Sequence, residues 1–242
     1  MYSAAVPWAL LAATAAAYLV GLATGQRWLL PLLNTVPAYA VMVSLLRRGQ
    51  RGRAVAAMLL WAAAMAVVGT AALWLWPAAP DATVVHGTAY RDEMFHWIRS
   101  GEGSEGSPRL FLPQHLAHLA GFVALSLATA SAASIFMGAV LMNYMDFYVA
   151  SLARAGTPAW AAILLGWQPW AICRVAAFCI LGVVLAEPLL ARLARYSYPG
   201  LGAARRWLAI AGALIAADWV LKAALAPTWG RWLRALLPAS GP

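Results

Sequence analysis

The sequence predicts an all-α, polytopic transmembrane helix bundle with a cap of loop and helix on its extracytoplasmic side. Of its 242 residues, 64% are apolar and 10% are charged, against about 45–50% and 25% in an average soluble domain. The apolar residues gather in runs of the length that a bilayer crossing requires, about 20 residues. Short turns between these runs hold most of the arginines. We therefore exclude a soluble protein and expect residues 1–242 to form a single integral membrane domain.

The charge balance predicts an orientation. The formal net charge is +9, and Lys222 is the one lysine among 17 basic residues. Arg47, Arg48, Arg51 and Arg53 occupy one short turn, and such turns stay in the cytoplasm under the positive-inside rule. We expect a bacterial inner-membrane protein with a cytoplasmic N-terminus, lipid as its main surroundings and no nucleic-acid partner.

Each span follows from an apolar run. Residues 114–153 would form a helix about 60 Å long, twice the hydrocarbon thickness, so we expect two spans with a turn at 129–134. The run at 159–190 contains Gly-Trp-Gln-Pro-Trp at 166–170, where it should break into a short piece and a true span. Seven spans result, with the C-terminus outside; six spans, with 114–153 crossing once, is the alternative. The remaining spans are expected at 7–22, 28–46, 54–76 and 207–226.

A polar segment at 77–113 follows the third span, and we expect it to be extracytoplasmic. It holds most of the acidic residues, namely Asp81, Asp92, Glu93, Glu102 and Glu105. Its Gly/Ser/Glu run at 101–107 lacks the lysine of a phosphate-binding loop and should form a flexible turn. Glu93 and His96 are three residues apart, as are His115 and His118 just beyond the segment, and this spacing places both members of a pair on one helix face.

These side chains suggest a metal centre. The candidate ligands are Glu93, His96, His115 and His118, with His86 as an outlier. Three histidines would bind zinc and leave a water in the fourth position, with Glu93 or Asp92 as the base. Copper and nickel also accept imidazole. The alternatives are an ordinary water-exposed loop without a ligand, or a surface that docks a partner.

Polar residues inside the predicted spans form a second group of candidates. Asp146, beside Asn143, falls near the middle of a span, where an unpaired carboxylate costs at least about 2.5–3.5 kcal/mol. It should therefore be paired, protonated or in contact with water. The expected pairs are Asp146 with Arg174, Glu187 with arginines of the following loop, and Asp218 with Lys222 one turn along its helix. Structural pairing, a substrate or proton path, and a contact with a partner are all open for these residues.

One stretch of the chain is similar to a known family. The points of similarity, in chain order, are Gly138, Asn143, the Gly166-Trp167 junction and Gly182. Through them, residues from about 118 to 190 resemble the stage II sporulation protein M family of bacterial integral membrane proteins. Trp167 and Arg174 stand where that family shows His-Gly and a glutamate. The resemblance implies a membrane component of a larger assembly or transport process, with no catalytic residues.

Three functional hypotheses follow. The first is a transport-like or scaffolding component of a larger membrane assembly, without catalysis of its own and in contact with other membrane subunits. The second is a membrane-embedded metalloenzyme with an extracytoplasmic His/Glu site, which requires at least three of the candidate ligands to converge. The third is an accessory subunit of an energy-transducing complex that holds a pigment or a quinone.

Overall fold

The protein is an all-α bundle. The structure, a computed structural model, describes residues 5–76, 83–194, 200 and 202–238, and none of these lies in a β-strand. Within these residues, seven helical segments are long and apolar enough to cross a membrane, as the sequence predicts. They are Val6–Thr24, Leu29–Arg47, Arg51–Leu75, Pro108–Thr129, Ala132–Arg154, Pro169–Leu193 and Gly202–Leu236.

The third span contains an irregular turn. After α1 (Ala5–Thr24) and α2 (Leu29–Arg47), this span consists of α3 (Arg51–Ala64), the π-helical turn η1 (Met65–Gly69) and α4 (Thr70–Leu75). The sequence does not predict η1, because the apolar run is uninterrupted there. Single π-helical turns inside α-helices are rare and occur frequently at functional sites.

The expected turn near residue 130 is confirmed. It joins α7 (Pro108–Thr129) to α8 (Ala132–Arg154) through Ala130 and Ser131, whose φ angles of 49° and 68° are left-handed. The hydroxyl of Ser131 donates to the carbonyl oxygen of Gly182 at 2.6 Å, which fixes the turn against a neighbouring span. The two helices are antiparallel neighbours, so the alternative of a single crossing here is wrong.

The expected break near residue 167 is also confirmed. The short helix α9 (Ala159–Gly166) ends there, and α10 (Pro169–Ala194) begins after Trp167 and Gln168. Pro169 suits the first position of a helix because that position needs no N–H donor.

The last span is longer than a membrane is thick. The helix α11 (Arg205–Leu236) has 32 residues, about 48 Å at 1.5 Å per residue, against about 30 Å of hydrocarbon. Its final turns pack against α6 (Gly87–Ser100). There Arg234 Nε donates to the carbonyl oxygen of Ile98 at 2.6 Å, near the helix C-terminus, where a cation is favoured.

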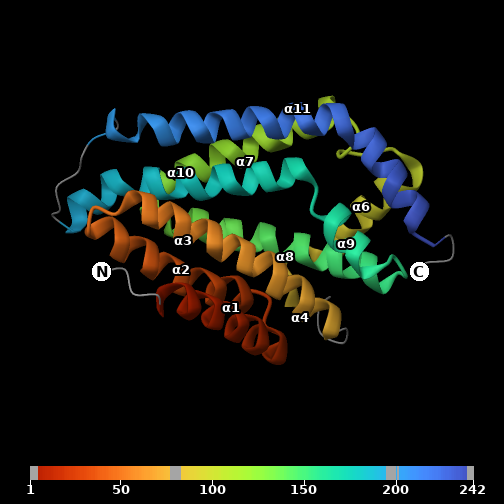
Figure 1. Cartoon of the computed structure of the whole chain (residues 1–242), viewed down its shortest axis with the longest axis horizontal. Helices are drawn as coiled ribbons and strands as arrows, with labels where there is room; N and C mark the ends of the chain where they lie inside the picture. Colours follow the sequence, from red (N-terminus) through yellow and green to blue (C-terminus); the bar gives the residue numbers. More distant parts are fainter. Residues whose placement is uncertain (1–4, 77–82, 195–199, 201, 239–242) are drawn as a thin grey trace.

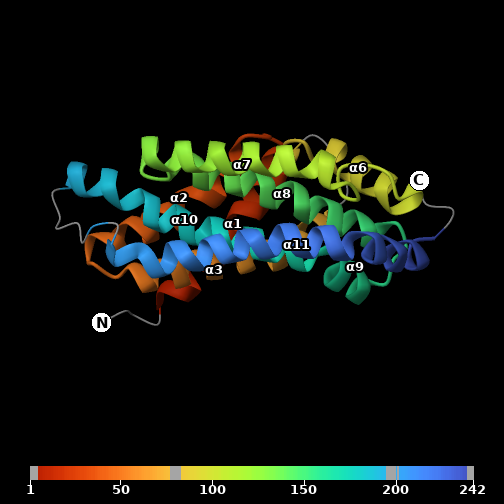
Figure 2. The same ribbon diagram turned by 90° about the horizontal axis from the view of Figure 1, so that it is seen from above.

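The helices form a long bundle around α8 and α10. In Figure 1, α11 lies on one side of the bundle and α1 on the other, with α10, α3 and α8 between them. Figure 2 shows α7 and α11 running lengthwise along the same bundle. The short helices α6 and α9 both lie at one end, beside the last part of α11. We name this end the α6 end.

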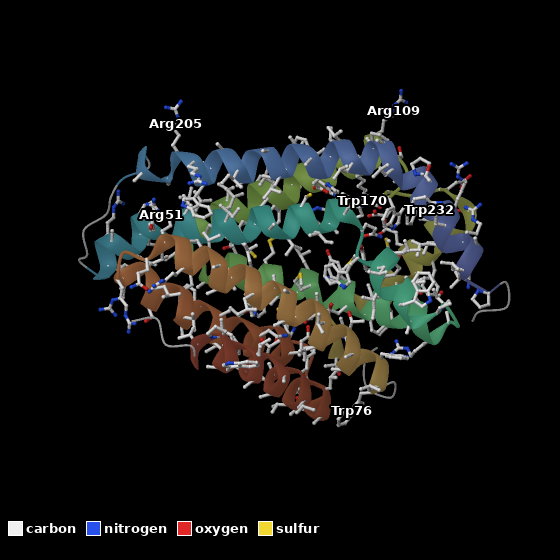
Figure 3. The ribbon with its side chains drawn as sticks, viewed as in Figure 1. Arg51, Trp76, Arg109, Trp170, Arg205 and Trp232 are labelled. Atoms are coloured by element: carbon white, nitrogen blue, oxygen red, sulfur yellow. The ribbon has the colours of Figure 1, made fainter. Side chains whose placement is uncertain are left out.

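The opposite end is the arginine-rich end, defined by the turn that holds Arg47, Arg48, Arg51 and Arg53. Figure 3 shows Arg51 and Arg205 near this end and Arg109 and Trp232 toward the α6 end. Arg51 Nη2 pairs with Glu187 Oε2 at 2.5 Å. The partner of Glu187 therefore comes from α3, which corrects the expected pairing with the loop that follows Glu187.

Candidate functional site

A cavity lies inside the bundle where α7, α8 and α10 face one another. Residues of α2 and α3 line it on the far side. Its volume, counted for the centres of water-sized molecules, is about 110 Å³. One buried water needs roughly 10–15 Å³ of such volume, so the cavity has room for several waters or for part of an elongated organic molecule.

The cavity is polar toward the α6 end and apolar toward the arginine-rich end. Along α10, its lining extends from Trp170 to Gly182, about 18 Å at 1.5 Å per residue. The polar lining includes Glu93, Glu105, His115, His118, Gln168 and Arg174. The apolar lining includes Met42, Trp61, Phe122, Ile135, Leu141 and Phe178. The cavity is therefore long and amphipathic.

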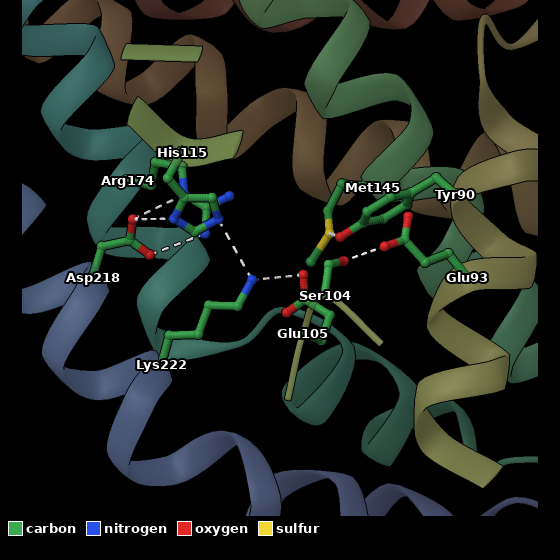
Figure 4. A network of polar contacts seen from close by, with 9 residues as sticks. All are labelled: Tyr90, Glu93, Ser104, Glu105, His115, Met145, Arg174, Asp218 and Lys222. Atoms are coloured by element: carbon green, nitrogen blue, oxygen red, sulfur yellow. Dashed lines mark hydrogen bonds and ion pairs between the residues drawn. The ribbon is translucent and has the colours of Figure 1, made fainter. Parts of the chain in front are cut away.

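Two buried ion pairs stand at the polar end (Figure 4). The guanidinium of Arg174 donates from Nε and Nη2 to the two carboxylate oxygens of Asp218, each at 3.0 Å. Lys222 Nζ donates to Glu105 Oε1 at 2.8 Å. Asp218 and Lys222 are each 1% exposed, so both need partners to offset the loss of water. Two cations face two anions, and the formal charges cancel.

His115 joins the two ion pairs. Its Nδ1 lies 3.4 Å from Asp218 Oδ2, and its Nε2 lies 3.4 Å from Lys222 Nζ. An ammonium group only donates, so a neutral His115 accepts at Nε2 and carries its hydrogen on Nδ1, toward Asp218. Lys222 also lies 4.7 Å from the ring centroid of Phe111, a cation–π distance.

The loop at 101–107 is held at two points rather than free. The Ser104 hydroxyl donates to the carboxylate of Glu93 on α6, and Glu105 accepts from Lys222 on α11. Figure 4 shows both contacts beside Tyr90, whose hydroxyl donates to the sulfur of Met145 at 3.4 Å. Burial raises the pKa of Tyr90 well above its usual value of 10, so this side chain stays a neutral phenol.

Besides His115 Nδ1, which lies 3.4 Å from Asp218 Oδ2 without a hydrogen bond, two N–H donors next to the cavity have no acceptor. The indole Nε1 of Trp167 and the amide Nε2 of Gln168 are buried, and neither finds a partner within the described residues. Both residues line the cavity and lie in the break between α9 and α10. A buried unpaired donor costs about 1–3 kcal/mol, so these two groups favour a bound molecule with oxygen acceptors, or water.

The predicted metal ligands do not come together. Glu93, His115 and His118 line the cavity, whereas His86 and His96 are exposed. In the described parts of the chain, no group of three or more His, Cys, Asp or Glu side chains is placed to hold a metal ion. The convergence that the metalloenzyme hypothesis requires is therefore not found there.

The two candidate bases differ in their surroundings. Glu93 lines the cavity and accepts from Ser104. Asp92 instead pairs with Arg91 next to it at 2.8 Å, and its side chain is 66% exposed. An exposed pair of this kind contributes little to stability.

The expected pairs inside the spans are corrected. Arg174 pairs with Asp218 and not with Asp146, because Arg174 projects toward α11. Asp218 and Lys222 do not pair with each other; Lys222 reaches Glu105 instead. Asp146 and Asn143 lie on another face of α8, where both contact the hydroxyl group of Tyr18.

The sequence alone does not identify three residues of the site. Glu105 lies in a run whose composition predicts a flexible turn, and the sequence around Trp167 and Gln168 predicts only a break between helices. One signal was available: Lys222 is the one lysine of the chain and lies in a predicted span, so an acidic partner was required. Spacing along the sequence could not show that this partner lies 117 residues away.

Comparisons of the chain with models of known protein families, with curated proteins and with solved structures found no match.

Proposed function

We propose that this protein is a transport-like membrane component that binds an amphipathic, lipid-like molecule in its interior cavity. One observation carries the proposal: the cavity, whose lining extends about 18 Å along α10, joins a polar end with buried unpaired donors to an apolar part. Ligand sites are typically apolar clefts with a few polar groups that fix orientation. An elongated molecule with a polar head matches both parts at once.

The unpaired donors define the head of this molecule. Trp167 Nε1 and Gln168 Nε2 require oxygen acceptors. The charged groups that line the cavity are Glu93, Glu105 and Arg174, which gives no excess of positive charge. A head with carbonyl, ester or zwitterionic oxygens therefore fits better than a strongly anionic one. A membrane lipid and a quinone share this chemistry, and their masses distinguish them.

The orientation belongs to the same proposal. We place the arginine-rich end at the cytoplasmic face of a plasma membrane, following the positive-inside rule. Several arginines at the α6 end are engaged by the protein itself: Arg154 Nη1 donates to the Leu73 carbonyl oxygen at 2.6 Å, and Arg234 to Ile98. With this orientation the head of the bound molecule lies in the outer half of the bilayer.

Retention of the ligand tests the proposal. The wild-type protein is purified in mild detergent and analysed by native mass spectrometry and by solvent extraction. We expect one amphipathic molecule per chain, and we expect Gly138→Leu to lose it, because Gly138 lines the apolar part and no atom lies within 4 Å of an added Cβ. The control is Gly212→Leu, another helical glycine with open space but outside the cavity.

Two results would contradict the proposal. One is a wild-type protein that carries no small molecule even after incubation with lipid extract from its host membrane. The other is a molecule that both glycine variants retain equally. A protein that copurifies in equal amount, without any small molecule, would favour the scaffolding hypothesis instead.

A further inference from the structure

A second polar cluster lies on the other side of α8, away from the cavity. Its centre is Asp146, which is 0% exposed and lies about 21 Å along α8 from the start of that helix at Ala132. It therefore falls within the hydrocarbon thickness of about 30 Å. Neither Asp146 nor its neighbour Asn143 lines the cavity.

Among the described residues, only neutral groups form hydrogen bonds with the Asp146 carboxyl group. The hydroxyl oxygen of Tyr18 on α1 lies 2.8 Å from Oδ2, and the Thr70 hydroxyl donates to Oδ1 at 3.2 Å. No lysine, arginine or histidine among the described residues forms an ion pair with it. The other acidic groups in the spans, Glu187 and Asp218, both have an arginine partner. An unpaired charge at this depth costs at least about 2.5–3.5 kcal/mol, so a neutral carboxyl group is favoured.

The hydrogen atoms of the cluster balance when Asp146 is protonated. The hydroxyl oxygen of Tyr18 lies 2.8 Å from Asp146 Oδ2 and also 2.8 Å from Asn143 Oδ1. A phenol has one hydrogen to donate and cannot supply both contacts. If the carboxylic acid donates to Tyr18, then Tyr18 donates to Asn143. Asn34 Nδ2 donates to the same Asn143 oxygen at 3.2 Å.

The backbone of the third span packs closely against the Asp146 carboxyl group. Gly69, the last residue of the π-helical turn η1, packs so closely that an added Cβ would overlap Asp146 Oδ2 and the Tyr18 hydroxyl. Asn34 is 2% exposed, and its Oδ1 has no partner within the described residues. A rare helical geometry and an unpaired polar atom at one place are typical of functional sites.

The packed elements bring one titratable side chain into contact with Asp146, which is Tyr18 from α1. α2 contributes an amide and α4 a hydroxyl, neither of which titrates. On the nearby face of α8, Arg91 and Arg154 lie over the ring of Phe147, 5.6 and 5.5 Å from its centroid. Arg154 also donates to Ser151 and to the backbone of α4.

We propose that Asp146 is a proton-binding site whose carboxyl group takes up a proton from water and returns it to water. An asparagine would make the same hydrogen bonds without the risk of a buried charge, so the property that a carboxyl group adds is proton exchange. The side-chain oxygens of the cluster lie 2.8–3.2 Å from one another. These distances are within or just beyond the usual range for O–H···O bonds, so they suit a hydrogen between two oxygens and not a larger cation.

Infrared spectroscopy tests this proposal directly. Purified protein in lipid nanodiscs is titrated with pH while the C=O stretch of protonated carboxyl groups is recorded and circular dichroism monitors the fold. We expect a band at neutral pH that Asp146→Asn removes and that disappears reversibly at higher pH. The control Asp92→Asn should keep the band, because that side chain is exposed and paired with Arg91.

Further variants and conditions complete the test. Tyr18→Phe keeps the aromatic ring but removes the hydroxyl contact with Asp146, so it should shift both the band and its titration midpoint. This variant replaces Asp146→Asn in the test if Asp146→Asn does not fold. Absence of any band that depends on Asp146 or Tyr18 would overturn the proposal, as would a band that persists until the protein unfolds. Loss of the band when sodium replaces choline at constant pH would identify sodium, and not the proton, as the bound cation.

Discussion

Acidic side chains in the spans differ in their partners. Glu187 and Asp218 each face an arginine at 2.5–3.0 Å, whereas Asp146 contacts hydroxyl groups. A paired carboxylate is stabilised by its partner and loses that stabilisation when the partner is removed. The Asp146 carboxyl group lacks such a partner, which is the feature that the proposed proton-binding site uses.

The Arg51–Glu187 pair offers a direct test at the residue scale. The two side chains are 11% and 4% exposed, so Arg51→Leu would leave a buried carboxylate without its partner and should lower the free energy of unfolding by about 3 kcal/mol. The double variant Arg51→Leu/Glu187→Leu should recover most of this loss. Denaturant titration in detergent micelles measures both; a double variant as unstable as the single one would contradict the prediction.

Two glycines should respond in opposite ways to the same substitution. Gly69→Ala forces a Cβ into Asp146 and Tyr18 and should lower the free energy of unfolding by about 1–3 kcal/mol. Gly138→Ala enters open space and should raise it by about 0.5–1 kcal/mol, because alanine is the better helix former. Thermal unfolding of both variants in one detergent gives the comparison. Equal midpoints would mean that η1 is not packed against the carboxyl group.

The sequence predicts which buried charged residues need partners, but it does not identify the partner residues. The cost of a buried charge applies to Asp146, Arg174 and Lys222 alike, and it correctly marks them as candidates. Pairing depends on which helix face each residue occupies and on which helices become neighbours. Arg174 faces α11 and so meets Asp218, a choice that no local spacing encodes.

At the scale of the elements, composition predicts most of the architecture. Apolar runs locate the seven spans, and the excess length of residues 114–153 predicts the turn at Ala130 and Ser131. The Gly-Trp-Gln-Pro-Trp run marks the break before α10. The π-helical turn η1 and the ends of α11 could not be predicted, because they depend on what packs against a uniformly apolar helix.

The 101–107 loop is an element held by a buried charged contact in addition to the contact between Ser104 and Glu93. Glu105 is 8% exposed and is held by Lys222. Lys222→Met should therefore release the loop, and its backbone amides should exchange with deuterium about tenfold faster, because a hydrogen bond to a charged group contributes about 1.5–3 kcal/mol. The control Arg231→Met changes an exposed residue of the same helix. Unchanged exchange in the Lys222 variant would show that other contacts hold the loop.

The whole molecule has two polar sites on different sides of α8. The cavity gathers donors and compensated charges at the α6 end, and the Asp146 cluster lies between α1, α2 and α4. Taken together, the two proposals describe the parts of a proton-coupled carrier. The two sites share α8, so a movement of this helix would affect both.

In the proposed orientation, the two ends of the bundle face opposite sides of a membrane. Single cysteines test this in a background that lacks the native Cys173 and Cys179. Glu102→Cys marks the α6 end and Gly202→Cys the arginine-rich end; both positions are exposed, and an added Cβ at Gly202 meets no atom within 4 Å. In intact spheroplasts, a membrane-impermeant maleimide should label Glu102→Cys and should label Gly202→Cys only after permeabilisation. Equal labelling of both cysteines from the outside would contradict the account.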